Sequence, residues 1–439
     1  MSIFYGLYVI LSGSLFLFFF PFFWLYTRVT GRYSEHLEER LGILSSLVFQ
    51  RLKGTPRIWI HAVSLGEVKV AASIIESMKR RMPGCAVTLS TVTEHGRQLA
   101  KDTFGEDIPL FYAPIDFVGS VRKALSTVRP DIIIFLETEL WPAWLFEARR
   151  MGIKTILVNG RISARSIPKY LKLRPFFRDV LENFDSLSMI SEKDADRIIA
   201  MGADPEKISI CGNAKYDLLG KIAEPSIEVE MRRMLNLEKS QRVFVAGSTR
   251  EGEEIMILDA YEKILKKFPD TILLIAPRHI VRTPKIISLI KERGFTYQLR
   301  TDFNRPGTTR TERVVIINSF GELFNIFSIA TIVFCGASLV PLGGQNPLEA
   351  AVWGKVIFYG PFMENFLDAR MLLEKAGGGV QVSSPESLAE KAIWFFNHPE
   401  DLESYGRKAR DAVMNNLGTG DKHAQEIEHV LTGEAVSQT

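Results

Sequence analysis

The stretch Arg57-Ile-Trp-Ile-His-Ala-Val-Ser-Leu-Gly-Glu67 decides the fold of this chain. Its apolar run from Ile58 to Val63 predicts a buried strand, and the Ser-Leu-Gly sequence at its end predicts a turn. Apolar residues then recur at helical spacing from Val68 to Met78, so Glu67 is expected where the strand passes into a helix. Ligands of open α/β sheets bind beyond the carboxyl ends of the strands. Glu67 is therefore a candidate catalytic base, kept ionised near neutral pH by the helix start. A carboxylate that only caps its own helix is the alternative.

The alternation of strand and helix patterns continues through most of the 439 residues, a length that predicts more than one domain. Such alternation is typical of parallel sheets with helices on both faces. The polar segment 221–241 separates two series. We expect two doubly wound Rossmann-like α/β domains, residues 29–221 and 222–439, facing a cleft in which ligands bind. Strand patterns occur at residues 58–63, 86–91, 109–113, 132–136, 155–158, 186–190 and 208–211, and then at residues 243–246, 272–275, 297–299, 314–317, 332–335 and 356–359.

The N-terminal run from Ile3 to Tyr26 contains no charged residue and predicts a transmembrane helix. At about 1.5 Å per residue it can cross a hydrocarbon core of roughly 30 Å. A signal peptide would have basic residues before the apolar run and a small-residue cleavage site, and neither is evident. A buried core helix is the other alternative. Because Arg28, Arg32 and Arg40 follow the run, the positive-inside rule predicts a single-pass anchor at residues 1–28 with the remaining chain in the cytoplasm.

Composition gives little indication of other chemistry. The net charge of +3 does not indicate a nucleic-acid binder. Cys85, Cys211 and Cys335 have neither metal-ligand spacing nor evident pairing, which suits a reducing compartment. The sequence contains no phosphate-loop lysine signature and no G-x-G-x-x-G run.

Two more strand ends in the first half carry charged side chains. The strand at 132–136 ends in Glu137 and Glu139, which share one face because alternate residues of a strand do. The strand at 208–211 leads to Lys215, a cation that could neutralise a phosphate or carboxylate. The plainer alternatives are a helix cap and a solvated acid for the two carboxylates, and a solvated lysine.

The second half offers three loops at successive strand ends. Ser248-Thr249 presents hydroxyls and amides, and Arg278 is placed for an anion. The third loop reads Gly343-Gly-Gln-Asn346-Pro347-Leu348-Glu349, with Asn346 as the expected N-cap and Pro347 as the first helical residue. Amides of such a loop can hold a phosphate, and its final glutamate could instead bridge ribose hydroxyls. Each loop alone is a weak signal, and the three together are a better one.

Taken together, these segments resemble the bacterial Kdo transferases, which add 3-deoxy-D-manno-octulosonic acid (Kdo) to lipid A precursors. The segments occur in the family's order, from the apolar run to beyond residue 360, and as a set they are specific. They are His61-Ala-Val-Ser-Leu-Gly-Glu67, Glu137-Thr-Glu-Leu-Trp-Pro142, Arg161-Ile-Ser-Ala-Arg165-Ser166, Lys215-Tyr-Asp217, Ser248-Thr249, Glu251-Gly-Glu-Glu254, Pro277-Arg278-His279, Gly321-Glu322 and Gly343-Gly-Gln-Asn-Pro-Leu-Glu349.

The resemblance implies a GT-B glycosyltransferase that catalyses an inverting single displacement without a metal or cofactor. It implies a lipid A precursor as acceptor on the N-terminal domain and CMP-Kdo as donor on the C-terminal domain. The partners are then the two substrates and the cytoplasmic leaflet of the bacterial inner membrane, and no nucleic acid. Glu67 matches the family's general base, and Glu137 and Lys215 match positions that stabilise the transition state. The CMP-binding loops match Pro277, Arg278, Phe320, Gly321, Glu322, Asn346, Pro347, Leu348 and Glu349.

Two residues of the donor half depart from the family's pattern, because Arg250 and Gln345 stand where histidine is expected. The stretch 161–178 mixes six basic residues with aromatic and leucine side chains. It is a candidate for contact with anionic headgroups or lipid A phosphates, and an ordinary helix with a solvated basic face is the alternative. Two other functions stay open: a GT-B transferase that uses another nucleotide sugar and lipid acceptor, and a membrane-anchored nucleotide-binding protein without catalysis.

Overall fold

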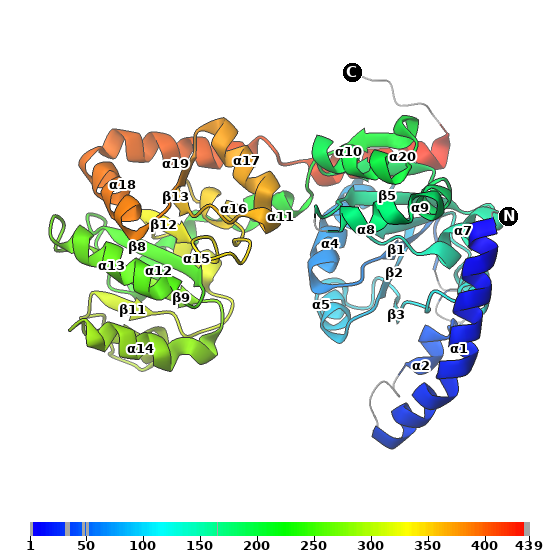
Figure 1. Cartoon of the computed structure of the whole chain (residues 1–439), viewed down its shortest axis with the longest axis horizontal. Coiled ribbons are helices and arrows are strands. Elements are labelled where there is room, and N and C mark those ends of the chain that lie inside the picture. The colour runs from blue at the N-terminus through cyan, green and yellow to red at the C-terminus, as the bar shows by residue number, and fades with distance from the viewer. Residues whose placement is uncertain (1–2, 31–35, 46–48, 50–51, 165, 434–439) are drawn as a thin grey trace. The chain divides into compact units, whose positions relative to one another are not determined.

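The computed structural model describes residues 3–30, 36–45, 49, 52–164 and 166–433 (Figure 1). The chain divides into two compact units: one contains the residues up to Leu218 together with the last helix, and the other contains Leu219–Leu417. Each unit is built on a parallel sheet of seven strands with helices packed against it, so the predicted pair of doubly wound α/β domains is confirmed. Arg32 and Arg165, which took part in the sequence predictions, lie outside the described residues.

The strands of the first sheet lie in the order β3-β2-β1-β4-β5-β6-β7. Alternate strand residues face opposite sides of the sheet. Trp59 packs with residues of α6, α7, α9 and α10, whereas Ile58 and Ile60 pack with residues of α4, α5 and α20. Both faces are therefore buried, as the nearly continuous apolar strands require. The strands are β1 (Arg57–His61), β2 (Ala86–Thr91), β3 (Leu110–Tyr112), β4 (Ile132–Leu136), β5 (Lys154–Gly160), β6 (Ser186–Met189) and β7 (Ile208–Ile210). The helices of this unit include α4 (Leu65–Arg81), α5 (Glu94–Phe104), α6 (Val118–Val128), α7 (Pro142–Arg150), α8 (Ile167–Lys172), α9 (Arg174–Leu181), α10 (Glu192–Met201) and α20 (Thr419–Thr432).

The strand order of this sheet changes direction between β1 and β4, since β2 and β3 lie on one side and β5, β6 and β7 on the other. In open α/β sheets, such a change of direction marks the ligand-binding edge. Glu67 follows β1 and Glu137 follows β4. The topology therefore brings to one edge two carboxylates that the sequence predicted separately.

The second sheet has the order β10-β11-β9-β8-β12-β13-β14, with its change of direction between β8 and β12. The sequence did not predict β14, because Gly377, Gly378 and Gly379 interrupt the apolar pattern there. The strands are β8 (Val243–Thr249), β9 (Ile272–Pro277), β10 (Tyr297–Leu299), β11 (Val314–Ile316), β12 (Ile332–Cys335), β13 (Val356–Tyr359) and β14 (Gly379–Gln381). Helix α11 (Lys215–Ile222) begins in the first unit, and the helices after it are α12 (Pro225–Met234), α13 (Glu253–Leu265), α14 (Thr283–Glu292), α15 (Leu323–Phe327), α16 (Leu348–Ala351), α17 (Leu367–Ala376), α18 (Pro385–Asn397) and α19 (Pro399–Met414).

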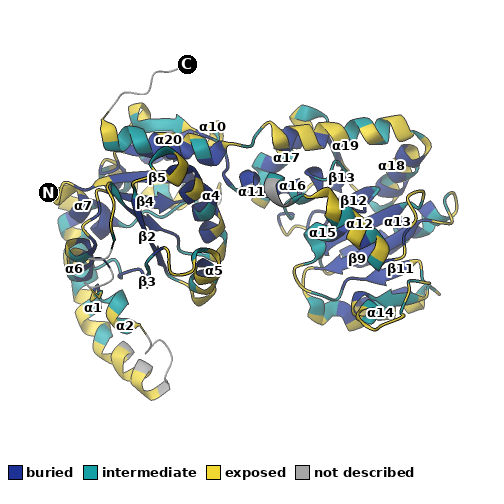
Figure 2. Ribbon diagram, turned by 180° about the vertical axis from the view of Figure 1, so that it is seen from behind, coloured by how far each residue is buried: buried dark blue, intermediate teal, exposed yellow. Residues whose placement is uncertain are grey.

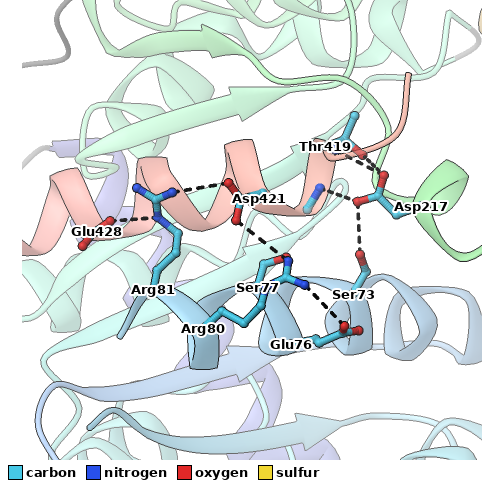
Figure 3. Close-up of polar contacts among 10 residues, drawn as sticks. Ser73, Glu76, Ser77, Arg80, Arg81, Asp217, Thr419, Asp421 and Glu428 are labelled. Carbon is cyan, nitrogen blue, oxygen red and sulfur yellow. Dashed lines mark hydrogen bonds and ion pairs between the residues drawn. The ribbon is translucent and has the colours of Figure 1, made fainter. Parts of the chain in front are cut away.

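The last helix, α20, belongs to the first unit, so the predicted domain 222–439 is wrong for its C-terminal end. Ala424 and Ile427 of α20 are fully buried in the core beneath α4. On the polar side of the contact, Arg81 Nε of α4 lies 2.9 Å from Glu428 Oε2 (Figure 3). The amphipathic pattern of α20 predicts a helix, but it cannot tell which of two similar sheets the apolar side covers.

Helix α1 (Ile3–Thr30) includes a segment, Ile3–Tyr26, long and apolar enough to cross a membrane, and only 6% of its most apolar window is buried. Figure 2 shows it mostly exposed beside the buried sheet of the first unit. Its first turns nevertheless contact that unit. The Tyr5 hydroxyl donates to Glu147 Oε1 at 3.3 Å and the Tyr8 hydroxyl donates to Asp116 Oδ2 at 2.5 Å. The chain returns to the same unit at α2 (Leu37–Arg40). Helix α1 is thus a candidate membrane anchor, and a crossing stays a prediction.

Candidate active site

Glu67 lies in the first turn of α4, three residues after the N-cap Ser64. Its Oε1 accepts a hydrogen bond from Ser64 Oγ at 3.0 Å, and its Oε2 accepts one from Val63 N at 2.7 Å. Ser64 Oγ in turn accepts from Glu67 N at 3.4 Å, much as in a capping box. The side chain therefore does cap its helix, as the alternative reading expected. A carboxylate has about four lone-pair positions, so two accepted bonds fix its orientation and leave it able to take a proton.

Burial sets the proton affinity of Glu67, whose residue surface is 7% exposed. The pKa of its carboxyl group is raised to about 7, mainly by burial, with further increases from the charges of Glu139 and Glu137. The hydrogen bonds from Val63 N and the Ser64 hydroxyl act in the opposite direction. The loss of hydration therefore raises the pKa of Glu67 by more than the helix N-terminus lowers it, although the helix N-terminus was expected to keep this group fully ionised. A pKa close to neutral pH suits a general base.

Glu137 and Lys215 form an ion pair at the same edge of the sheet. Lys215 Nζ lies 2.5 Å from Glu137 Oε1, with side chains 34% and 16% exposed, so neither group is simply solvated. Glu137 has a left-handed φ of 57°, unusual for a residue other than glycine. Its N–H donates to Val158 O and its carbonyl accepts from Arg161 N, so the loop after β4 is tied to β5. The pair therefore fixes a cation beside Glu137, whose own charge acts on Glu67.

Glu139 is half-buried rather than solvated. Its Oε2 accepts a hydrogen bond from Trp141 Nε1 at 2.5 Å. Burial raises the pKa of its carboxyl group, and the charge of Glu137 adds to the rise. The edge thus holds three carboxylates and one lysine, and the charges of Glu139 and Glu137 add to the larger effect of burial on the pKa of Glu67.

Two residues that support this edge were given no role from the sequence. His61 is fully buried against the Trp141 and Trp144 rings, and burial lowers its pKa to about 3, so it stays neutral. Asn159, at the end of β5, has a left-handed φ of 54° and accepts a hydrogen bond from Ala214 N at 2.9 Å. It thereby ties β5 to the turn before Lys215. The Asn-Gly pair that ends an apolar run at 159–160 was the available signal.

In the second unit, Glu253 occupies the point where the strand order changes direction. Its carboxylate is fully buried and accepts four backbone hydrogen bonds. The donors are Arg250 N at 2.9 Å in the loop after β8, and Ala337 N at 2.7 Å, Ser338 N at 2.9 Å and Leu339 N at 3.0 Å in the loop after β12. The two central loops of this sheet are therefore locked together by one side chain.

Basic side chains gather where β8 and β9 end. Arg250 Nη1 lies 2.6 Å from His279 Nε2, so the imidazole accepts from the guanidinium, and Arg278 N donates to Thr249 O at 3.1 Å. Arg278 and His279 are exposed. Arg250, one of the two departures from the family's pattern, thus adds a cation at the predicted donor loop instead of disrupting it.

The remaining predicted donor residues lie in two loops of this unit. Phe320 is 89% exposed in a turn that Gly321 completes with a φ of 83°. Glu322 pairs with Arg300 at 2.7 Å.

In the second loop, Asn346 Oδ1 accepts from Leu348 N at 3.1 Å, and its Nδ2 donates to Glu349 Oε1 at 3.4 Å. Helix α16 begins at Leu348 with Pro347 as its N-cap, one residue later than predicted, because the Asn346 side chain bonds across the proline. Gln345, the other departure, contacts Cys335 through its backbone carbonyl.

Comparison with known proteins relates this geometry to one family. Residues 35–218 match the family described as 3-deoxy-D-manno-octulosonic-acid transferase (kdotransferase). A 3-deoxy-D-manno-octulosonic acid transferase of Haemophilus influenzae is 30% identical, over 88% of this chain and 89% of its own length. The chain belongs to the Kdo transferase family. A bifunctional glycosyltransferase/methyltransferase of Fusobacterium nucleatum is 32% identical over 84% of this chain, which spans 57% of that relative's length.

The fold of this Kdo transferase family member also agrees with a solved glycosyltransferase. A structure from Rickettsia africae covers 86% of this chain and 99% of its own, with a TM-score of 0.59 at 16% identity. The predicted GT-B fold class is thus confirmed. Among the described residues there is no group of three or more His, Cys, Asp or Glu side chains that could hold a metal ion.

Proposed function

We propose that the protein transfers Kdo from CMP-Kdo to a lipid A precursor in lipopolysaccharide biosynthesis, by an inverting displacement without a metal. The observation that carries the proposal is Glu67, a buried carboxylate with a pKa of about 7 at the ligand-binding edge of the first sheet, in a chain of the Kdo transferase family. That edge would bind the acceptor.

In the proposed reaction, Glu67 takes the proton of an acceptor hydroxyl. The hydroxyl oxygen bonds to the anomeric carbon of Kdo while the bond from that carbon to the phosphate oxygen of CMP breaks, and CMP leaves with the bonding electrons. Attack on the face opposite to CMP inverts the anomeric configuration. Lys215, oriented by Glu137, offsets the negative charge that develops as CMP departs.

The residues that bind CMP-Kdo would lie in the second unit. Arg278 supplies an exposed cation for the phosphate, and Pro277 precedes it at the end of β9. Phe320, Gly321 and Glu322 supply an exposed aromatic ring on a glycine turn. The residues Asn346, Pro347, Leu348 and Glu349 complete the CMP site.

We also propose that the enzyme works at the cytoplasmic face of the bacterial inner membrane, held there by α1. The segment of α8 and α9 supports this, since Leu171 of α8 (42%) and Leu173 between the two helices (58%) are exposed among basic side chains. Lys169 and Arg174 are exposed beside them. Apolar and basic groups on one surface suit an anionic leaflet.

The test combines the purified full chain, CMP-Kdo generated in situ and a tetraacylated lipid A precursor. We expect a mass gain of one or more Kdo residues, with Glu67→Gln as the inactive control. Transfer from a UDP-sugar instead would indicate another GT-B enzyme, and nucleotide binding without transfer from any donor would indicate a protein without catalysis. Either result would refute the proposal.

A further inference from the structure

The carboxylate of Asp217 joins three helices of the first unit (Figure 3). Asp217 is 8% exposed and lies two residues after Lys215 in α11. Its Oδ1 accepts from Thr419 N at 3.2 Å and from Thr419 Oγ1 at 3.0 Å. Its Oδ2 accepts from Gly420 N at 2.6 Å and from Ser73 Oγ at 3.3 Å. One side chain therefore bonds to the start of α20 and to α4 while its own backbone belongs to α11.

Two of the three joined helices carry residues of the candidate site, and the third lacks a side-chain cap of its own. Helix α4 carries Glu67 in its first turn, and Ser73 lies less than two turns further along it. Helix α11 begins with Lys215 itself. Helix α20 starts at the N-cap Gly418, which has no side chain to satisfy the first N–H groups. Asp217 supplies the missing cap from another helix, and its negative charge is favourable at a helix N-terminus.

The residues around the Asp217 carboxylate and Thr419 are closely packed. A Cβ on Gly420 would lie 2.6 Å from Ser73 Oγ and 2.9 Å from Asp217 Oδ2. A Cβ on Gly212, three residues before Lys215, would lie 2.7 Å from Thr419 Cγ2. Close packing on both sides of Thr419 and Gly420 means that a displacement of α20 must displace the start of α11.

Helix α20 is in turn fixed against the rest of the unit. Arg81 of α4 pairs with Glu428 at 2.9 Å and with Asp421 at 3.3 Å (Figure 3). His423 Nδ1 lies 2.8 Å from Ser188 Oγ of β6, and its Nε2 lies 3.1 Å from Gly212 O. Helix α20 therefore forms a rigid link between the sheet, α4 and the loop that leads to Lys215.

We propose that Asp217 is a positioning residue for Lys215: through α20 and Ser73, it holds the first turn of α11 so that the ammonium group meets Glu137 beside Glu67. The inference rests on the proposed function only in assigning Lys215 and Glu67 to Kdo transfer. It makes the last helix of the chain part of the acceptor-side machinery, although that helix touches neither Glu67 nor Lys215 in the contacts described.

The test compares Asp217→Asn and the milder Thr419→Val with the full-length enzyme. Asparagine keeps the size of aspartate but points an N–H group at a donor, and valine removes one hydroxyl donor. We expect kcat to fall by up to about 100-fold for Asp217→Asn, the scale of a 1 Å misplacement, and by a smaller factor for Thr419→Val. CMP affinity and the KM for CMP-Kdo should not change, since those contacts belong to the second unit. Asp196→Asn, at an exposed position of α10, is the matched control and should stay within about twofold of wild type.

A second readout does not depend on activity. The rate of Lys215 acetylation by acetic anhydride, measured by mass spectrometry against the exposed Lys69, should rise several-fold in Asp217→Asn and not in Asp196→Asn. Unchanged Lys215 reactivity, or a loss of activity that matches a loss of folded protein, would overturn the inference. A wild-type enzyme that transfers no Kdo would refute the proposed function alone, and the acetylation rates would still decide the role of Asp217.

Discussion

Replacement of Glu67 by glutamine should make the enzyme inactive and, above neutral pH, more stable. The folded state holds the pKa of this carboxyl group at about 7 against an ordinary value of 4.5. At 1.36 kcal/mol per pKa unit, the difference corresponds to about 3 kcal/mol. The folded state binds the proton more tightly than the unfolded chain does. The stability that this tighter proton binding contributes is therefore fully present below pH 4.5. That stability is lost as the pH rises to 7.

Glutamine removes this pH-dependent loss and also the hydrogen bond that Oε2 accepts from Val63 N, worth about 1 kcal/mol if its amide turns away. Glu67→Gln should therefore be about 2 kcal/mol more stable than wild type at pH 8, a rise in Tm of about 4–8 °C for a unit of this size. At pH 4 the gain disappears, and the variant becomes slightly less stable. Thermal unfolding in detergent from pH 4 to pH 8 measures the difference.

The same group sets the pH dependence of turnover. Wild-type kcat should fall about tenfold per pH unit below an acid limb near pH 7, since the base must be ionised, and Glu67→Gln should lose about 10²- to 10⁴-fold. Glu94→Gln is the matched control, because Glu94 is also an acid at a helix start, in α5, and is exposed. An acid limb near pH 4.5, or a stability difference between Glu67→Gln and wild type that does not vary with pH, would refute the reasoning.

Three further outcomes are expected. Lys215→Met should lower kcat by at least about 100-fold and move the acid limb to higher pH, because Glu137 would then face Glu67 unneutralised; CMP titration should show unchanged affinity. Glu253→Gln should destabilise the second unit by roughly 1–3 kcal/mol in urea unfolding, since one amide cannot accept all four N–H groups; a loss in the first unit instead would contradict this. A cysteine at Ile3, which is 88% exposed, should resist a membrane-impermeant maleimide added outside intact spheroplasts, whereas labelling would indicate a crossing helix.

Local patterns predicted the strands other than β14, and the place of Glu67, because each depends on neighbours in sequence. The patterns that predict the strand, the Ser-Leu-Gly turn and the helix all lie within residues 57–78. The pKa of Glu67 could not be predicted in the same way. It depends on burial under the helices and on Glu139 and Glu137, which the order of strands brings to the same edge.

Pairings between distant segments were beyond the sequence for the same reason. Nothing near Lys215 indicates that its partner is Glu137, because the ion pair requires β7 and β4 to end at one edge of a finished sheet. The family resemblance implied a role for Glu137 and for Lys215 but did not predict that the two residues form an ion pair. The contacts of Asp217 with α20 were the hardest to predict, because the apolar side of α20 could have packed equally well on either of two similar sheets.

Helix α1 shows where a composition rule and a set of contacts lead to different expectations. Hydropathy and the arginines after the run predict a crossing with the helix start on the far side of the membrane. Yet the Tyr5 and Tyr8 hydroxyls donate to Glu147 and Asp116 of the first unit, and the chain rejoins that unit at Leu37. A crossing would carry the start of α1 away from Glu147 and Asp116 and break both hydrogen bonds, so we expect a cysteine at Ile3 to be protected while these contacts persist.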